Sequence, residues 1–169
     1  DTTAVVLYVD SVGLIGGDID LIRAHPLLSG LDIDHIIIGT THGHDTPDTL
    51  GLWGPTATST GRQQFVLDKL YDASAAVIKQ AIETAKPANL VIASTKLLND
   101  PANPNSLTDD FNKDIRDPII FDPTLTIARF VDASNPSSTI GTLVNWANHP
   151  EASHFSDTDS SQITAHYVH

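Results

Sequence analysis

Residues 35–45 (HIIIGTTHGHD) contain the features that decide the fold. The first half is a short run of β-branched apolar residues, which is typical of a strand buried on both faces. The second half places His42 and His44 directly after that strand. In extended backbone, side chains two positions apart project to the same side. The stretch therefore predicts a strand that brings both imidazoles to one site.

Strand and helix patterns alternate around this stretch, and a hairpin follows them. Apolar runs predict strands at residues 4–10, 35–40, 90–95, 124–132 and 140–147. The last two runs are separated by an Asn/Pro/Ser-rich turn, which favours a β-hairpin. We expect an α/β fold with a layered mixed β-sheet and flanking helices. We also expect residues 1–169 to be a single domain, the N-terminal portion of a larger catalytic domain.

Two helices are predicted between these strands. Residues 18–28 begin with Asp18 and Asp20, either of which could cap a helix, and Pro26 should end it. Residues 61–86 form the longer helix, in which Thr60 and Gln63 have the spacing of a capping box. Its apolar positions recur near the helical period and include Phe65, Leu70, Tyr71, Ala73, Val77, Ala81 and Ile82.

The composition excludes several classes of partner. The chain of 169 residues has a formal net charge of -12 with only 9 Lys and Arg residues, so a nucleic-acid partner is not expected. No apolar run approaches the roughly 20 residues of a transmembrane helix, so we expect no transmembrane segment. The chain begins at Asp1 and contains no Cys or Met. These features favour a secreted or periplasmic protein whose signal peptide has been removed.

A second strand ends in a histidine. Residues 145–149 (NWANH) close the last predicted strand with His149, which precedes Pro150 and Glu151. Ligand sites in open α/β sheets gather at the carboxyl ends of strands, so His149 and His42 could meet in space. A structural interpretation stays open, in which His149 caps the hairpin and the two loop histidines make ordinary hydrogen bonds.

Imidazoles without cysteine favour zinc over magnesium or calcium, which prefer oxygen ligands. A catalytic zinc needs three or more protein ligands. The local candidates for the others are Glu151, Asp45, Asp10 and Tyr167. None of them stands out by its spacing.

Three motifs occur in the same order as in the neutral/alkaline ceramidases, and the chain resembles the N-terminal part of that family. They are residues 41–45 (THGHD), 122–130 (DPTLTIARF) and 145–149 (NWANH). The resemblance implies a zinc-dependent hydrolase that cleaves the amide of an N-acyl sphingoid base such as ceramide. It also implies that His42 and His149 bind Zn2+ and that His44, beside the metal, handles substrate or protons.

The resemblance places the nucleophile and the remaining ligands in the rest of the same polypeptide chain, beyond His169. The chain also departs from the family, because Asp45 replaces a serine and Pro150-Glu151 follows the last histidine. A carboxylate at Asp45 could orient His44 or add a ligand, which makes both residues catalytic candidates.

Other interpretations remain open. The 148–149 pair (NH) and the strand-end Asp10 allow a dinuclear metallophosphoesterase, although the D-x-H arrangement expected after the first strand is missing. The chain could also be a non-catalytic metal-binding fragment or module. Leu50, Leu52 and Trp53 could line an apolar cleft for an acyl chain or anchor a long loop to the core.

Overall fold

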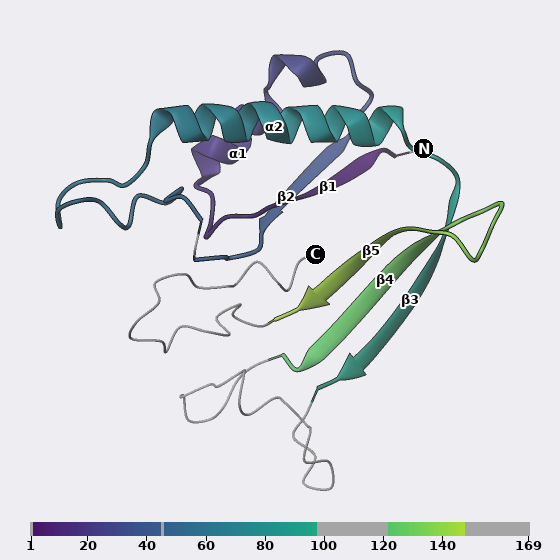
Figure 1. Ribbon diagram of the computed structural model, residues 1–169. Coiled ribbons are helices and arrows are strands. Elements are labelled where there is room, and N and C mark those ends of the chain that lie inside the picture. Colours follow the sequence, from purple (N-terminus) through teal and green to yellow (C-terminus); the bar gives the residue numbers. More distant parts are fainter. Residues whose placement is uncertain (1, 45, 98–121, 148–169) are drawn as a thin grey trace, which may run out of the picture. The chain divides into compact units, whose positions relative to one another are not determined.

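The computed structural model describes residues 2–44, 46–97 and 122–147 (Figure 1). In chain order the described elements are β1 (Ala4–Val9), α1 (Gly16–Arg23), the 3-10 helix η1 (Pro26–Leu28), β2 (His35–Thr40), α2 (Gln64–Glu83), β3 (Ala88–Lys96), β4 (Thr124–Asp132) and β5 (Thr139–Trp146). The fold is α/β, as predicted. The described residues form an N-terminal unit up to residue 85 and a C-terminal unit from residue 86. The expectation of a single domain stays a prediction.

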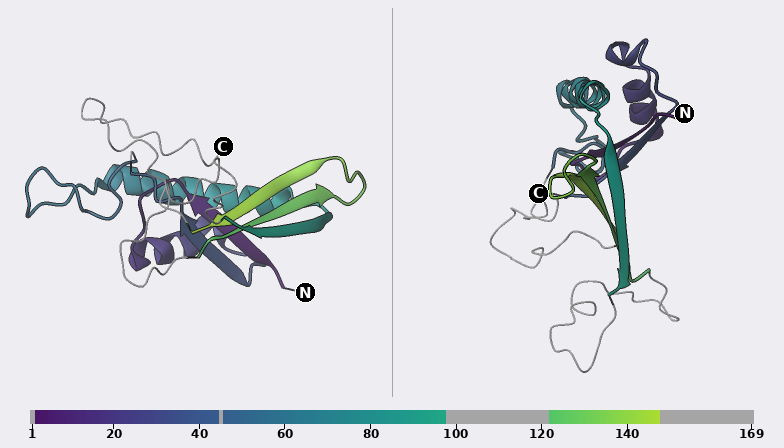
Figure 2. Two further views of the ribbon diagram at one scale, coloured as in Figure 1. Left: turned by 90° about the horizontal axis from the view of Figure 1, so that it is seen from below. Right: turned by 90° about the vertical axis from the view of Figure 1, so that its right-hand side faces the viewer.

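The N-terminal unit is built on two parallel strands. β1 pairs with β2 from Ala4 opposite His35 to Val9 opposite Thr40, and α1 lies in the connection between the two strands. Helix α2 packs against α1, η1 and β1, and both helices lie on the same side of the strands (Figures 1 and 2). The core between these layers consists of Val5, Leu7, Ile22, Leu28, Leu67, Tyr71, Ala75 and Ile78.

Side-chain periodicity explains this core. In β1, Val5 and Leu7 are buried while Val6 and Tyr8 face away from the core, as the period of two requires. In α2 the buried face contains Leu67, Tyr71, Ser74, Ala75 and Ile78. The helix was predicted. Of the apolar residues that recur near its period, Phe65 and Val77 are exposed, because α2 carries apolar residues on two sides and turns the other side toward β1.

Helix α1 begins two residues earlier than predicted and ends at Arg23. Asp18 is not the N-cap residue. It lies in the first turn, where its carboxylate accepts a hydrogen bond from the backbone N–H of the N-cap residue Ile15 (3.2 Å). The remainder of the predicted helix is the short η1, with Pro26 in its first turn.

The capping box predicted for α2 is also wrong. The N-cap residue is Gln63 and its side chain makes no capping hydrogen bond. The Thr60 hydroxyl instead accepts a hydrogen bond from the backbone N–H of Arg62 (3.1 Å), two residues before the helix starts. Among the residues that the structure describes, no helix combines the length and apolar character needed to span a membrane.

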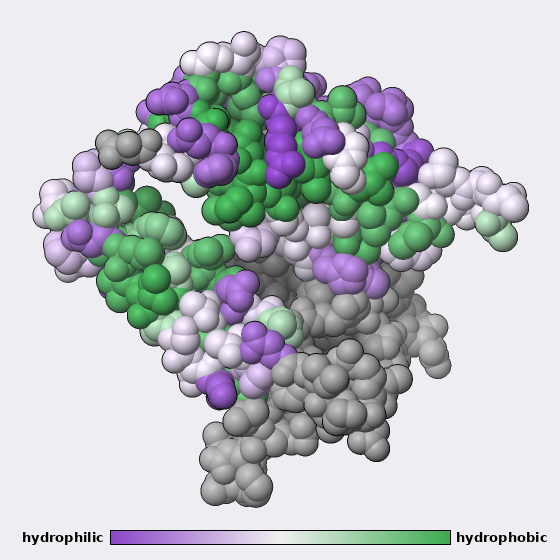
Figure 3. All heavy atoms as spheres, turned by 180° about the vertical axis from the view of Figure 1, so that it is seen from behind, coloured by the Kyte–Doolittle hydropathy of each residue, from purple (hydrophilic) through white to green (hydrophobic). Residues whose placement is uncertain are grey.

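The C-terminal unit is an antiparallel sheet in the order β3-β4-β5. Ala88 lies opposite Asp132 in the first pair, and Leu125 lies opposite Trp146 in the second, which confirms the predicted hairpin. Within residues 86–97 and 122–147 only Val131 is buried. Apolar side chains therefore lie on the surface over this sheet, at the left of Figure 3.

Candidate functional site

The two loop histidines lie where the parallel strands of the N-terminal unit end. Hydrogen bonds continue one residue beyond β2, since the Thr41 backbone N–H donates to the Val9 carbonyl (3.1 Å). The Thr41 hydroxyl donates to Oδ1 of Asp10, the residue that follows β1 (2.6 Å). Hydrogen bonds thus hold the carboxyl ends of β1 and β2 together, and His42 follows directly in the chain. This is the edge of a parallel sheet at which ligands usually bind.

His42 does not continue the strand. Its φ angle is 61°, and it is the one non-glycine residue in the described part of the chain with positive φ. The expected extended H-x-H geometry is therefore wrong, because the chain turns sharply at the first histidine. Left-handed backbone conformation at a non-glycine residue raises the free energy of the folded state, and residues in this conformation cluster at functional sites. Nδ1 of His42 lies 2.7 Å from the Val12 carbonyl, so Nδ1 carries the proton that it donates there.

The turn brings the two imidazoles together. Nε2 of His44 lies 3.3 Å from Nε2 of His42, and the ring centroids are 4.8 Å apart at an interplanar angle of 79°. Two nitrogens that bind one tetrahedral zinc at about 2.0–2.1 Å are themselves about 3.3–3.5 Å apart. The pair can therefore share a proton or bind one cation. Residues 42 and 44 share a site as the sequence predicted, although by a different backbone geometry.

A carboxylate organises the loop after the histidines. Oδ1 of Asp48 accepts hydrogen bonds from the backbone N–H groups of Leu50, Gly51 and Leu52 (3.1, 2.6 and 3.1 Å), and Oδ2 accepts one from Trp53 (2.8 Å). Partial burial raises the pKa of Asp48, but these four hydrogen bonds lower it by more, so it lies below its ordinary value. The carboxylate is therefore ionised at neutral pH and holds this turn rigid.

The same loop places an aromatic ring beside the histidines. The ring centroid of Trp53 lies 6.0 Å from that of His44. Trp53 and Leu52 remain 52% and 64% exposed, so neither anchors the loop to the core. Leu50, by contrast, packs beside Gly13, where a Cβ would lie 3.0 Å from its side chain. Of the three apolar loop residues, Leu52 and Trp53 are the ones placed to contact another molecule.

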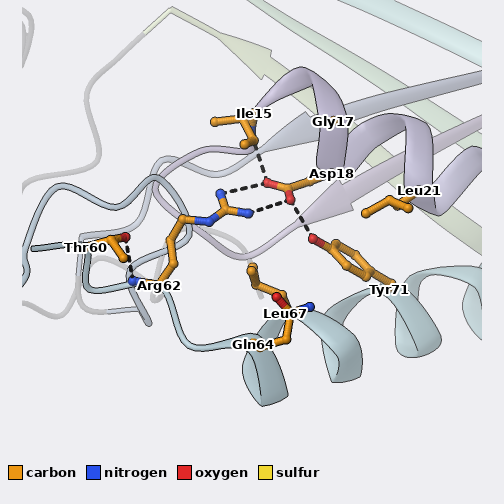
Figure 4. A pocket seen from close by; sticks show the side chains of 9 residues that line it. All are labelled: Ile15, Gly17, Asp18, Leu21, Thr60, Arg62, Gln64, Leu67 and Tyr71. Carbon is orange, nitrogen blue, oxygen red and sulfur yellow. Dashed lines mark hydrogen bonds and ion pairs between the residues drawn. The ribbon is translucent and has the colours of Figure 1, made fainter.

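The end of the loop is fixed by a buried ion pair that sequence analysis missed. Arg62 Nη2 donates to Asp18 Oδ1 (2.7 Å) and Nη1 donates to Oδ2 (3.1 Å), and the Tyr71 hydroxyl donates to Oδ1 (2.5 Å) (Figure 4). Arg62 Nη1 also donates to the Thr49 carbonyl. Asp18 and Arg62 are 44 positions apart, so no local pattern relates them. An acidic residue at 2% exposure is found only with such partners.

Each member of this cluster affects the protonation of the others. Burial raises the pKa of the Asp18 carboxyl, but hydrogen bonds from Arg62, Tyr71 and Ile15 lower it by more, so it lies below its ordinary value. Burial and the hydrogen bond to Asp18 raise the pKa of Tyr71 to about 12. At neutral pH the cluster is an ionised Asp–Arg pair with a neutral phenol.

The cluster borders a pocket of about 490 Å³. It is lined by Ile15, Gly17, Asp18, Leu21, Thr60, Arg62, Gln64, Leu67 and Tyr71 (Figure 4). Neither loop histidine lines it.

Several predicted site residues fall outside the described part of the chain. They are Asp45, His149, Glu151 and Tyr167. Asp10 lies beside the site and binds Thr41. Across residues 2–44, 46–97 and 122–147, no group of three or more His, Cys, Asp or Glu side chains is arranged to hold a metal. The geometry thus provides a pair of nitrogens, and His149, the zinc ligand predicted together with His42, is not among the described residues.

Comparison of the chain with protein families, with curated proteins and with solved structures found no match.

Proposed function

We propose that this chain forms part of a zinc-dependent amide hydrolase that resembles the neutral ceramidases and cleaves an N-acyl sphingoid base or a related lipid amide. One observation carries the proposal. The Nε2 atoms of His42 and His44 face each other across 3.3 Å at the carboxyl end of β2, and His42 is fixed by the Val12 carbonyl. A hydrogen bond from the second ring nitrogen to a backbone carbonyl is typical of zinc-binding histidines.

The donor atoms fit zinc. With Nδ1 protonated, the lone pair of His42 is on Nε2, the atom that would hold the ion. His149 is the proposed second ligand. The absence of cysteine and the imidazole donors favour zinc over oxygen-preferring cations. When bound, zinc supplies Lewis-acid polarisation of the amide carbonyl.

His44 is the residue proposed to move the proton. Its Nε2 lies beside the proposed metal-binding atom of His42, and an imidazole nitrogen can both accept and donate a proton. Amide cleavage requires a proton to leave the attacking group and another to reach the leaving nitrogen, which one histidine can accomplish in sequence. Asp45, the next residue, is proposed to orient the His44 ring.

The exposed loop residues suit an apolar substrate. Trp53 lies next to His44 and Leu52 precedes it, and both side chains are held outward by the backbone hydrogen bonds to Asp48. Burying their exposed apolar surface against a hydrocarbon chain would be favourable. A lipid amide therefore fits this surface better than a small polar amide does.

Zinc binding by histidine variants tests the metal site. Zinc titration followed by calorimetry should show one site per chain, which His42→Ala abolishes or weakens by well over tenfold. His35→Ala removes an exposed histidine from the start of β2 and should leave the affinity unchanged. If His44→Ala weakens zinc binding as much as His42→Ala does, His44 is a ligand and its proton-transfer role is wrong. Equal zinc binding by wild type and His42→Ala would refute the metal site.

Product analysis tests the reaction. The full polypeptide, loaded with zinc, should release fatty acid from N-acyl sphingosine and should not hydrolyse a phosphodiester. Two metal ions per chain together with phosphodiester hydrolysis would establish the metallophosphoesterase instead. Zinc binding without either activity would leave a non-catalytic metal-binding module.

A further inference from the structure

The segment that follows β1, together with the first turn of α1, is attached at three points to the rest of the N-terminal unit. The Val12 carbonyl accepts the hydrogen bond from His42 Nδ1 (2.7 Å). The next carbonyl, of Gly13, accepts one from the Thr49 hydroxyl (2.5 Å). Asp18, five residues further on, pairs with Arg62. The acceptor that orients His42 thus lies one residue from a contact with the long loop.

Arg62 links these contacts to one another. Its guanidinium donates to both carboxylate oxygens of Asp18 and also to the backbone carbonyl of Thr49. A bidentate pair restricts orientation as well as distance. Thr49 is 2% exposed, and its hydroxyl and its carbonyl are both paired inside the protein. Fixing Arg62 therefore fixes Thr49, and Thr49 fixes Gly13 beside the Val12 carbonyl.

The carboxylate in this network is saturated rather than available for a ligand. Oδ1 of Asp18 accepts from Arg62 Nη2 and from Tyr71, and Oδ2 accepts from Arg62 Nη1 and from the Ile15 amide. A carboxylate with four donors has little capacity left for a substrate. The neighbouring pocket therefore does not explain why the charge is buried, whereas holding the loop in place does.

We infer that Asp18, Arg62, Tyr71 and Thr49, here called the Asp18 clamp, are positioning residues for His42. The clamp fixes the Val12 carbonyl, and this carbonyl holds the His42 ring with Nε2 directed toward His44. Thr49 is the coupling residue, because its hydroxyl contacts the β1–α1 segment and its carbonyl contacts Arg62. The inference deepens the proposed zinc site and rests on it for its metal readout.

Thr49→Val tests the clamp with the smallest change. It removes the hydroxyl bonded to Gly13 and retains both the carbonyl for Arg62 and the approximate side-chain shape. Thr49→Ser restores the hydroxyl. Thr84→Val is the matched control, because the Thr84 hydroxyl also donates to a backbone carbonyl, that of Gln80 (2.8 Å), at the far end of α2. Circular dichroism confirms that each variant is folded.

Two readouts separate the clamp from the metal site. The first is the ring-nitrogen NMR spectrum of metal-free protein, with the His42 signals assigned by His42→Ala. The wild type should show His42 protonated at Nδ1, and Thr49→Val should broaden this signal or shift it toward a mixture of tautomers. The second is zinc affinity, which Thr49→Val should lower about 10–100-fold, as loss of a residue that orients a ligand does. Thr49→Ser and Thr84→Val should retain wild-type behaviour in both.

Each outcome decides the inference. If Thr49→Val gives the wild-type His42 spectrum, the clamp is overturned. If Thr84→Val lowers the zinc affinity as much as Thr49→Val does, the clamp is also overturned. If wild type binds no zinc, the proposed function fails, and the NMR comparison alone then supports or overturns the clamp. Arg62→Met, measured in the same way, should reproduce the Thr49→Val spectrum if the network acts through Thr49.

Discussion

The two units of the molecule use similar strand sequences with different results. β1 and β2 are apolar and β-branched, and α2 covers one side of β1, so Val5 and Leu7 become buried. β3 also contains an apolar run, residues 90–93 (LVIA), yet none of its residues is buried. Side-chain identity alone therefore does not decide burial. A strand acquires a core face only where a second layer packs on it.

The difference extends to the polar groups. In the N-terminal unit, Asp18 is buried and receives four hydrogen bonds. In the C-terminal unit, the side-chain contacts lie on the surface, as between Lys86 and Asp132 (2.9 Å) or Ser94 and Thr126 (2.9 Å). Buried charge pairs resist solvent screening, whereas exposed ones contribute little. The stability of the described residues should therefore depend mainly on the N-terminal unit.

The largest expected effect comes from truncating the core of the N-terminal unit. Ile78 is 1% exposed on α2, and Ile78→Ala should lower the free energy of unfolding by about 2–5 kcal/mol. Ile92→Ala, at a β3 residue that is 60% exposed, should change it by about 0.5 kcal/mol or less. Urea unfolding followed by far-ultraviolet circular dichroism, which records helices and strands alike, measures both variants. Equal losses in the two variants would abolish the contrast between the units.

The next effect is a dependence on alkaline pH that only the N-terminal unit should show. The pKa of Tyr71 is raised to about 12, above its ordinary value near 10. Between these values the folded state holds a proton that the unfolded state has lost, so stability is complete below pH 10 and falls as pH rises toward 12. The loss should reach about 2–3 kcal/mol.

Unfolding of Tyr71→Phe over the same pH range checks this. The variant lacks the hydrogen bond to Asp18, so its free energy of unfolding should be lower at neutral pH. Because it also lacks the ionisable phenol, this free energy should change less between pH 10 and 12. The exposed Tyr8→Phe variant controls for the loss of a phenol as such. A wild-type slope in Tyr71→Phe would mean that another group causes the alkaline loss.

Local periodicity was enough to predict the elements. β2 and β4 have the predicted ends, and the other strands and α2 differ by one to three residues. The start of α1 was wrong because Asp18 serves in its first turn rather than at its cap. The periodicity of α2 did not show which of its apolar residues are buried, because a helix with apolar residues on two sides needs tertiary contacts to select one.

The site was only partly predictable. The spacing of His42 and His44 indicated that they share a site, but the left-handed turn that brings them together does not follow from residue spacing. The partners of Asp18 could not be predicted, because Arg62 and Tyr71 reach it across 44 and 53 positions of chain. Contacts at such separations depend on the packing of α1 against α2 and the loop between β2 and α2.

A smaller effect should distinguish the functional loop from regular structure within the N-terminal unit. Gly51 has a φ angle of 86°, and an added Cβ would lie 2.7 Å from the Thr60 hydroxyl oxygen. Gly51→Ala should therefore cost about 1–2 kcal/mol and weaken the turn bound by Asp48. At Gly16, the first residue of α1, an added Cβ would have no atom within 4 Å. Gly16→Ala should therefore raise the free energy of unfolding by about 0.4–1 kcal/mol. Thermal unfolding of both variants should give shifts of opposite sign.

The smallest expected effect examines the exposed sheet itself. Val144 on β5 is 55% exposed, and Val144→Thr keeps a β-branched side chain while replacing a methyl group with a hydroxyl. On a surface strand this exchange should change the free energy of unfolding by less than about 0.5 kcal/mol. Under a second layer it would bury an unpaired hydroxyl, which costs about 1–3 kcal/mol. A loss of that size would therefore show that a second layer covers β5, and the contrast between the two units would then not be a property of the strands.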